Sequence, residues 1–422
     1  MTLSSSPMRR AGRRLLTLGA LLAGDRRRWW PGLLLVALTV GLAACTSSSG
    51  QRSTPSSQQG SAAPRQRDYW PTAGWRTAPP KAEGMDPAVL AAIPGNVASL
   101  HPEVRSVLVV RHGYLVYEHY WQGMTASHGD NTYSVTKSVV SALVGIALGE
   151  GKLKGLDQPV GELLARHLPH NADPRLARVT LEQLLTMTSG LAGDDPSLGG
   201  DPHVSQRQGA SRDWVAHILG RRLTTDPGSS FAYSSATSQL LSAIVADATG
   251  QSTLAFARAR LFGPIGIASA NAPSPVFVTH PSQAAIKAYA RAPVAWPTDP
   301  QGYQLGFSGL KLPSRELAKF GYLYLNGGRW DTTQVIPADF VAASTRPHST
   351  PPPDGPAEGY GYQWWVASQA GHPGFLAVGY GGQLLQVVPD LDLVVVITSD
   401  ASRNRNDAGA LVGQAIIPAI TS

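Results

Sequence analysis

The stretch Ser134-Val-Thr-Lys-Ser-Val-Val-Ser-Ala-Leu-Val-Gly-Ile-Ala-Leu148 decides the fold of this chain of 422 residues. It opens with an S-x-x-K motif, and residues 135–148 are apolar at helical spacing on nearly every side. A helix of this composition is typical of the buried centre of a domain. Because residues i and i+3 share one helix face, Lys137 is expected beside the Ser134 hydroxyl at the helix start.

A serine and a lysine in this arrangement can form a nucleophile and its base. Burial and the positive end of a helix dipole lower the pKa of a lysine, and a neutral Lys137 can accept the Ser134 proton. The motif alone is weak evidence, since Ser134 can also be a plain helix cap beside a solvated lysine. A second copy, Ser308-Gly-Leu-Lys311, runs into Pro313 and opens no apolar helix, so the context favours Ser134.

Strand signals occupy both ends of the chain, and helix signals lie between them. Two pairs of β-rich runs, each separated by turn residues, predict hairpins at 104–110 with 114–120 and at 384–388 with 393–398. Helices are expected at 181–185, 238–248, 315–325 and 407–417, and a Gly/Asp/Pro-rich loop at 192–210. The pattern predicts one sheet assembled from both termini, with a helical insertion.

Several segments resemble the class C β-lactamase and penicillin-binding-protein-like serine hydrolases. Tyr133–Ser138 (YSVTKS) is similar to the first motif of that family, and further segments follow in the family's order over roughly residues 83–400. The nearest branch is that of the 6-aminohexanoate-dimer hydrolases and related esterases, to which Met187 and Ser235 are similar. The other matching segments are GKLKGLDQPV (151–160), VTLEQLLTMTSGL (179–191), Pro227 to Ser235, LFGPIGI (261–267), FGYLYLNGGRW (320–330) and GYGGQ (379–383) with the strands after it.

This resemblance implies an α/β (α+β) fold of the β-lactamase/transpeptidase type. An antiparallel sheet built from both chain ends would be flanked by helices, within a hydrolase domain at 69–422 that carries a helical subdomain at about 150–305. It also implies an enzyme that cleaves an ester or amide through an acyl-enzyme.

The resemblance assigns roles residue by residue. Ser134 would attack the carbonyl, and Lys137 would take its proton. Tyr233 fills the position of the second-motif tyrosine, which relays a proton to the leaving group; a tyrosinate-like form needs a cation such as Lys137 to lower a pKa near 10. The backbone N–H groups of Ser134 and Gln383 would form the oxyanion hole.

Two positions depart from the β-lactamase pattern. Ser235 stands where the second motif has asparagine, and Tyr380 stands where the third motif has a lysine or histidine that holds a substrate carboxylate. Esters, or amides without that carboxylate, are therefore expected as substrates rather than β-lactams. Gly381 and Gly382 would let the substrate approach the backbone closely.

Two other functions remain open at this point. One is a non-catalytic protein that binds peptidoglycan-like ligands, and the intact Ser134, Lys137 and Tyr233 argue against it. The other is a D-aminopeptidase or carboxypeptidase acting on cell-wall peptides, which Tyr380 weakens. The oligomeric state is not indicated by the sequence.

The N-terminal region indicates export and a lipid anchor. Three arginines at 26–28 precede an apolar run at 31–44, which is typical of a secretory signal and short for a membrane span. The run ends Leu42-Ala-Ala-Cys45, which resembles the bacterial lipoprotein box, and Cys45 is the only cysteine. We therefore expect a signal peptide at 1–44, lipidation of Cys45, a Ser/Gln/Pro-rich tether at 45–68 and a place on the outer side of the cell membrane.

The charge distribution and the motifs that the chain lacks argue against nucleic acids, nucleotide cofactors and metals as partners. Seven arginines and one aspartate lie in residues 1–44, so only about one unit of the net charge of +7 belongs to the rest of the chain, and nucleic-acid binding is not expected. The sequence contains no Gly-rich phosphate-binding loop, so no nucleotide cofactor is expected. No metal is expected either, because the chain has no H-E-x-x-H or paired-cysteine motif and the histidines at 101, 112, 119 and 128 are scattered.

Overall fold

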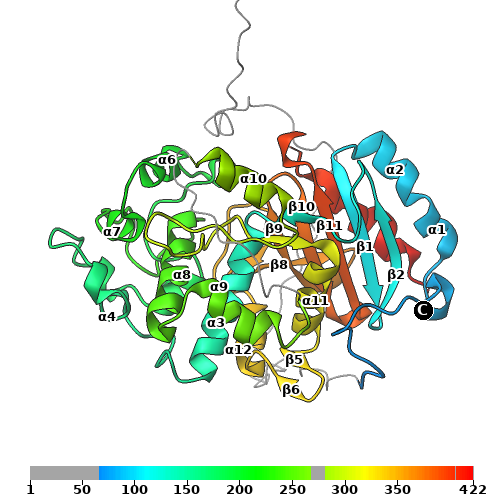
Figure 1. The fold of residues 1–422 in the computed structure, drawn as a ribbon, viewed down its shortest axis with the longest axis horizontal. Helices are drawn as coiled ribbons and strands as arrows, with labels where there is room; N and C mark the ends of the chain where they lie inside the picture. Colours follow the sequence, from blue (N-terminus) through cyan, green and yellow to red (C-terminus); the bar gives the residue numbers. More distant parts are fainter. Residues whose placement is uncertain (1–65, 268–280, 404, 422) are drawn as a thin grey trace, which may run out of the picture. The chain divides into compact units, whose positions relative to one another are not determined.

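A seven-stranded antiparallel sheet forms the centre of the protein, whose computed structural model describes residues 66–267, 281–403 and 405–421. The strand order is β2-β1-β11-β10-β9-β8-β7, so that the first hairpin lies against the last strand of the chain (Figure 1). Both predicted hairpins and the assembly of the sheet from both chain ends are therefore confirmed. The strands are β1 (Val104–Arg111), β2 (Tyr114–Tyr120), β7 (Gly359–Tyr360), β8 (Trp365–Gln369), β9 (His372–Gly379), β10 (Gln383–Val388) and β11 (Leu393–Ser399).

The two faces of the sheet bury different sets of helices. In β1, Val107 and Val109 join the apolar cluster beneath α1 (Pro87–Ala91), α2 (Ile93–Leu100) and the C-terminal turns. Leu108 and Val110 point the other way, into the larger cluster that contains α3 (Val135–Gly149) and α11 (Ser314–Leu325). Figure 1 shows α1 and α2 on the outer side of β1 and β2. The alternation of apolar residues along the strand thus supplies both cores.

Helix α3 is buried along most of its length, as its composition predicts. Every residue from Val135 to Ala147 is buried. The helix packs against α8 (Ser235–Thr249), which starts three residues before the predicted range, and α5 (Leu181–Leu185) packs on α8 in turn. Ser134 and Lys137 are therefore held by a rigid central element.

Helices and loops, with a few isolated β-bridges, make up the described residues between α3 and β4 (Figure 1). The segment 192–210, expected as a loop, also contains α6 (His203–Gly209). The other elements of the chain are β3 (Gly129–Asn131), α4 (Val160–Leu163), α7 (Trp214–Leu219), α9 (Thr253–Ala257), α10 (Gln283–Arg291), β4 (Lys311–Pro313), β5 (Arg329–Trp330), β6 (Thr333–Gln334) and α12 (Ala338–Ser344).

The predicted helix at 407–417 is not a single regular helix. A 3₁₀ turn, η9 (Asp407–Gly409), leads into a π-helical turn, η10 (Val412–Ile416), and then into a second 3₁₀ turn, η11 (Ile417–Ala419). Glycines at 409 and 413 and a proline at 418 explain the changes, because these residues are the poorest formers of a continuous α-helix.

The folded domain starts earlier than the predicted boundary at residue 69. Arg67, placed in the tether by composition, donates through both terminal guanidinium nitrogens to Asp392, at 2.7 and 2.8 Å, and through Nε to Asn326. The tether therefore ends before Arg67. Cys45 and the signal region lie outside the described residues.

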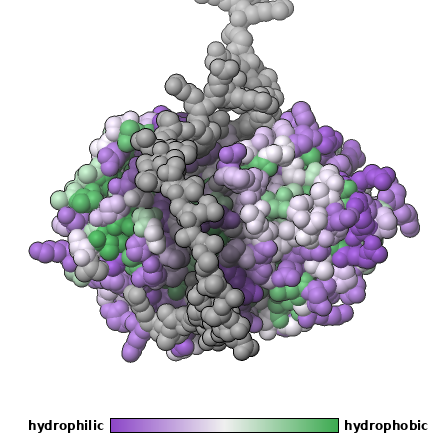
Figure 2. Space-filling model, turned by 180° about the vertical axis from the view of Figure 1, so that it is seen from behind, coloured by the Kyte–Doolittle hydropathy of each residue, from purple (hydrophilic) through white to green (hydrophobic). Residues whose placement is uncertain are grey.

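The surface opposite to the view of Figure 1 is mostly hydrophilic where it is drawn in colour, with smaller hydrophobic patches (Figure 2). Within the described residues, no helix is both long enough and apolar enough to cross a bilayer.

Candidate active site

Ser134 and Lys137 meet at the first turn of α3. Ser134 stands at the N-cap position with helical backbone angles, and its hydroxyl makes no capping hydrogen bond to the helix. Lys137 Nζ donates to Ser134 Oγ at 2.9 Å and to the carbonyl oxygen of Phe307 at 3.3 Å. The predicted side-chain pair is therefore in direct contact.

Burial changes the acidity of this lysine. Lys137 is only 1 % exposed, and loss of hydration lowers its pKa from 10.5 to about 8, although the charges of Asp194 and Asp195 act in the opposite direction. Its ammonium also lies 4.7 Å from the centre of the Tyr233 ring. A lysine with a pKa of about 8 is partly neutral near pH 7, which suits a base.

Tyr233 lies beside the same pair, but its acidity changes in the other direction. Burial raises its pKa above the ordinary value of 10, the carboxylates of Asp194 and Asp195 add to the increase, and a hydrogen bond with Ser134 opposes it. A tyrosinate-like form would need a cation such as Lys137 to lower this pKa, whereas burial raises it. Tyr233 is a neutral phenol in this site.

Aromatic rings line two sides of the pair. Tyr233 stacks on Trp365 with ring centres 5.3 Å apart and an angle of 24° between the planes. On the other side, Phe307 stacks on Trp214 at 6.4 Å, and Phe307 also supplies the carbonyl that Lys137 contacts. These rings limit the access of water to the ammonium and present apolar surface to a substrate.

The turn before the nucleophile holds backbone strain. Tyr133 has a φ of +48°, an uncommon value for a residue other than glycine. Its N–H donates at 2.9 Å to Oδ1 of Asn131, which also receives the N–H of Gly309 at 3.2 Å. Asn131 therefore fixes the turn that presents Ser134, a role that no sequence motif signalled.

The end of β9 lies against this same turn. A side chain at Gly379 would place its Cβ 2.3 Å from the carbonyl oxygen of Thr132, so only glycine fits there. The rings of Tyr380 and Tyr133 are 5.7 Å apart. Tyr380 therefore lies beside Tyr133, the residue that precedes Ser134.

The two glycines after Tyr380 stand at positions where a side chain would not fit. A Cβ on Gly381 would lie 2.3 Å from Cα of Ala401, and a Cβ on Gly382 would lie 3.0 Å from Oγ of Ser399. Both residues have positive φ values. The positions that a side chain would occupy are filled by the chain itself, so these glycines allow the turn to pack. Close approach of a substrate to their backbone stays a prediction.

Gln383 begins β10 opposite Gly379, and its side chain contacts the backbone of Ser399 at the end of β11. Its amide donates to the carbonyl of Ser399 at 2.8 Å and accepts the N–H of the same residue at 3.2 Å. The role of its backbone N–H as the second oxyanion donor stays a prediction.

Asp194 is a member of the site that sequence reasoning missed. Its Oδ1 accepts the backbone N–H of Ser235 at 3.0 Å, and its Oδ2 accepts the hydroxyl of Ser205 at 2.6 Å. The carboxylate thereby fixes the start of α8 beside Tyr233 and places a negative charge near Lys137. The only feature of the sequence that pointed to this residue was the Asp-rich composition of the loop after residue 191.

The second S-x-x-K copy forms no such pair. Lys311 Nζ donates to the carbonyl oxygens of Tyr289 and Ala290, at 3.1 and 2.8 Å, at the start of the short strand β4. The preference for Ser134 over Ser308 on grounds of helical context therefore agrees with the structure.

A half-buried Ser134 in contact with the buried Lys137 at the start of a central helix, beside a tyrosine and the end of strand β9, is an arrangement typical of serine hydrolases. The family model described as Beta-lactamase matches residues 92–415, which is most of the chain. The chain therefore belongs to the beta-lactamase family, and it is a serine hydrolase of that family.

Known proteins support both the fold and the class. A Bacillus anthracis protein assigned as a 6-aminohexanoate-dimer hydrolase has a similar structure, with a TM-score of 0.61, 19 % identity and coverage of 82 % of this chain and 86 % of that one. An octameric penicillin-binding protein homologue from Pyrococcus abyssi gives a TM-score of 0.59 with 17 % identity, covering 78 % and 77 %. At these identities the likeness concerns the fold.

A sequence relative of known activity class is Esterase EstB of Burkholderia gladioli. It is 33 % identical over 179 residues, which are 38 % of this chain and 44 % of EstB. The matches to curated relatives thus span less than half of the length of those proteins.

Proposed function

We propose that this protein cleaves a small ester or amide through an acyl-enzyme on Ser134, with Lys137 as the base. The observation that carries the proposal is the 2.9 Å contact between Lys137 Nζ and Ser134 Oγ, made by a buried lysine whose pKa burial lowers to about 8. A lysine of this kind loses its proton near neutral pH and can receive the hydroxyl proton.

The reaction then has two halves. Neutral Lys137 takes the proton of Ser134 while Oγ attacks the carbonyl carbon, and the tetrahedral intermediate expels the alcohol or amine. The leaving group receives that proton from the Lys137 ammonium through the Tyr233 hydroxyl, which is itself neutral. Water then attacks the acyl-enzyme by the same path, releases the acid and restores Ser134.

The surroundings of Ser134 favour substrates without a carboxylate. Tyr380 and Tyr133 stand on one side and Tyr233 with Trp365 on another, so the walls are aromatic. Tyr380 offers a hydroxyl where a cation would hold a carboxylate. An uncharged ester or short amide with apolar groups therefore fits the site better than a β-lactam or a peptide C-terminus.

The test is acyl transfer to Ser134. We would measure the hydrolysis of p-nitrophenyl butyrate by the wild type, by Ser134→Ala and by the matched control Ser308→Ala, which alters the other S-x-x-K copy. The expected result is nitrophenolate release by the wild type and the control, and none above background by Ser134→Ala. Activity that survives in Ser134→Ala would overturn the proposal. If no ester, short amide or D-peptide is turned over and intact mass shows no adduct, a binding role replaces catalysis.

We also propose that the protein is exported and held at the outer side of the cell membrane by a lipid on Cys45. The support is the order of basic residues, apolar run and Leu42-Ala-Ala-Cys45 in the sequence. Labelling of cells with a palmitate analogue should mark the wild type and leave Cys45→Ser unlabelled. Equal labelling of both proteins would refute this anchor.

A further inference from the structure

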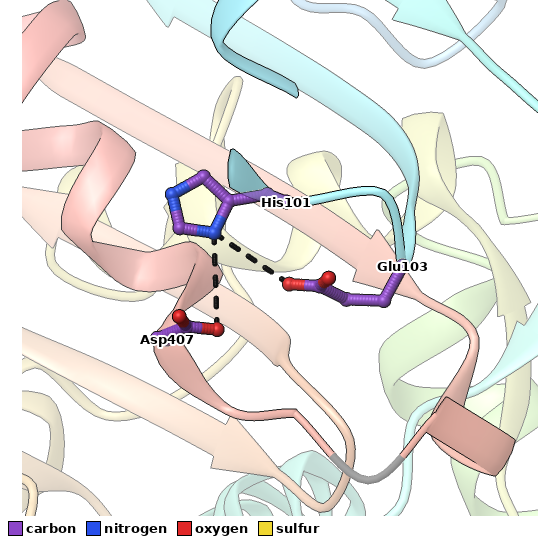
Figure 3. A group of neighbouring side chains, drawn as sticks. All are labelled: His101, Glu103 and Asp407. Atoms are coloured by element: carbon purple, nitrogen blue, oxygen red, sulfur yellow. Dashed lines mark ion pairs between the residues drawn. The ribbon is translucent and has the colours of Figure 1, made fainter. Parts of the chain in front are cut away.

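Three donor groups from opposite ends of the chain converge outside the active site. His101 follows α2, Glu103 precedes β1, and Asp407 starts η9 near the C-terminus. Figure 3 shows the imidazole of His101 facing both carboxylates. Its Nδ1 lies 3.6 Å from Oε1 of Glu103 and 3.8 Å from Oδ1 of Asp407, and the three donor atoms all lie within 4.8 Å of one another.

Four polar atoms of these three residues lack the hydrogen bonds that buried polar groups normally make. Glu103 is completely buried and His101 is 5 % exposed, yet His101 Nδ1, Asp407 Oδ1 and both carboxylate oxygens of Glu103 have no hydrogen-bond partner. Separations of 3.6 and 3.8 Å are too long for hydrogen bonds between the groups themselves. Leaving a buried carboxylate in this condition is costly, so the arrangement calls for a further partner.

The geometry points to a divalent metal ion between His101 Nδ1, Glu103 Oε1 and Asp407 Oδ1, and we propose a zinc or manganese site there. Tetrahedral ligands with bonds of about 2.1 Å are roughly 3.4 Å apart, close to the two measured separations. One imidazole and two carboxylates form a donor set that suits Zn²⁺ or Mn²⁺ better than Mg²⁺. The side chain of Asp407 is 44 % exposed, which leaves a path for the ion and for a water ligand.

Arg405 contacts the two carboxylates of the proposed metal site on the side away from His101. Its Nη2 donates to Oδ2 of Asp407 at 2.9 Å, and its Nε lies 3.6 Å from Oε2 of Glu103. The guanidinium thus faces the outer oxygens while the inner ones face His101. Partners placed in this way orient carboxylates that bind a metal. The competing explanation is an ion network of a protonated His101 and Arg405 with the two carboxylates, and in it the distances of 3.6 and 3.8 Å from Nδ1 are too long for hydrogen bonds to Oε1 and Oδ1.

The site would tie the C-terminal segment to the turn beside the nucleophile. Asn406, next to Asp407, accepts the N–H of Gly381 through Oδ1 at 2.8 Å. The N–H of Asp400 donates to the carbonyl of Glu103 at 2.7 Å. An ion bound to Asp407 would therefore hold the segment on which the Gly381 turn rests, so its main effect is on stability rather than on the chemical step.

The test is metal binding by the full-length chain carrying Cys45→Ser and no histidine tag, so that neither the thiol nor a tag can hold the ion. After removal of metal by a chelator, Zn²⁺ binding is measured by calorimetry and by metal analysis after dialysis. The variants are Glu103→Gln and Asp407→Asn, which keep the side-chain shape. The control is Asp390→Asn, whose carboxylate pairs with His372 at 2.7 Å outside the cluster.

The expected result is one Zn²⁺ per chain in the parent and in Asp390→Asn, and at least tenfold weaker binding in Glu103→Gln and Asp407→Asn. Zn²⁺ should raise the unfolding temperature of the parent and not that of Asp407→Asn, a readout that remains if Glu103→Gln fails to fold. Equal Zn²⁺ binding by the parent and Asp407→Asn, or none by the parent, would overturn the site. Mg²⁺ binding as tight as that of Zn²⁺ would overturn the role of His101.

Discussion

Replacing Lys137 by methionine should remove the activity and at the same time make the protein more stable. Burial lowers the pKa of Lys137 from 10.5 to about 8, which means that the charged ammonium destabilises the folded state. A shift of this size corresponds to about 3 kcal/mol of destabilisation at pH 7. Methionine has a similar length and no charge, but it leaves the Phe307 carbonyl without its donor, a loss of about 1 kcal/mol. The net gain is about 2 kcal/mol.

The gain should depend on pH in a defined direction. Between pH 8 and pH 10.5 the unfolded chain binds the Lys137 proton and the folded chain does not, so wild-type stability rises with pH across this window. The advantage of Lys137→Met is therefore complete below pH 8 and disappears towards pH 10.5. Urea unfolding of both proteins at pH 7 and pH 10 measures the difference, with p-nitrophenyl butyrate hydrolysis as the activity readout. A variant less stable than the wild type at pH 7 would refute the reasoning.

Three further predictions concern the same site. The kcat/KM for an uncharged ester should rise with pH and level off above about pH 8 as Lys137 loses its proton, and a profile that is flat from pH 6 to pH 9 would contradict this. Tyr233→Phe should lower kcat by about 10²- to 10⁴-fold while substrate binding persists, and unchanged kcat would exclude a proton relay through the hydroxyl. Gly381→Ala should cost about 3 kcal/mol in urea unfolding, because its Cβ would strike Ala401 at a positive φ. The control Gly371→Ala, also at positive φ but with open space around it, should cost about 1 kcal/mol, and equal losses would exclude the clash.

Much of the scaffold follows from local patterns. The apolar residues of 135–148 predict a buried helix, and the alternating runs at both ends predict the two hairpins, because helix and strand periods are properties of consecutive residues. The same locality explains why the Ser134–Lys137 contact is predictable, since three residues along a helix bring two side chains to one face. The exceptions, such as α6 and the irregular turns after Asp407, are short elements in which local preference is weak.

The surroundings of the nucleophile were not predictable in the same way. Asp194, Phe307 and Trp365 come from three separate parts of the chain and gather around Lys137 and Tyr233 only when the helices pack. The direction of the Tyr233 pKa also depended on packing, because it follows mainly from how deeply the phenol is buried. The need for glycine at position 381 also depended on packing, since a side chain there would clash with Ala401.

The sequence by itself indicated the class of the protein through segments that follow the order of a known family. It also placed Ser134 beside Lys137, because a three-residue spacing on one helix is a short-range constraint. The tertiary structure alone decided how deeply Lys137 is buried, and with it the direction in which its pKa changes. It also decided that His101 and Glu103 meet Asp407, some 300 residues further along the chain. The physical reason is that burial and long-range contacts depend on which surfaces pack together, and no local pattern of residues contains that information.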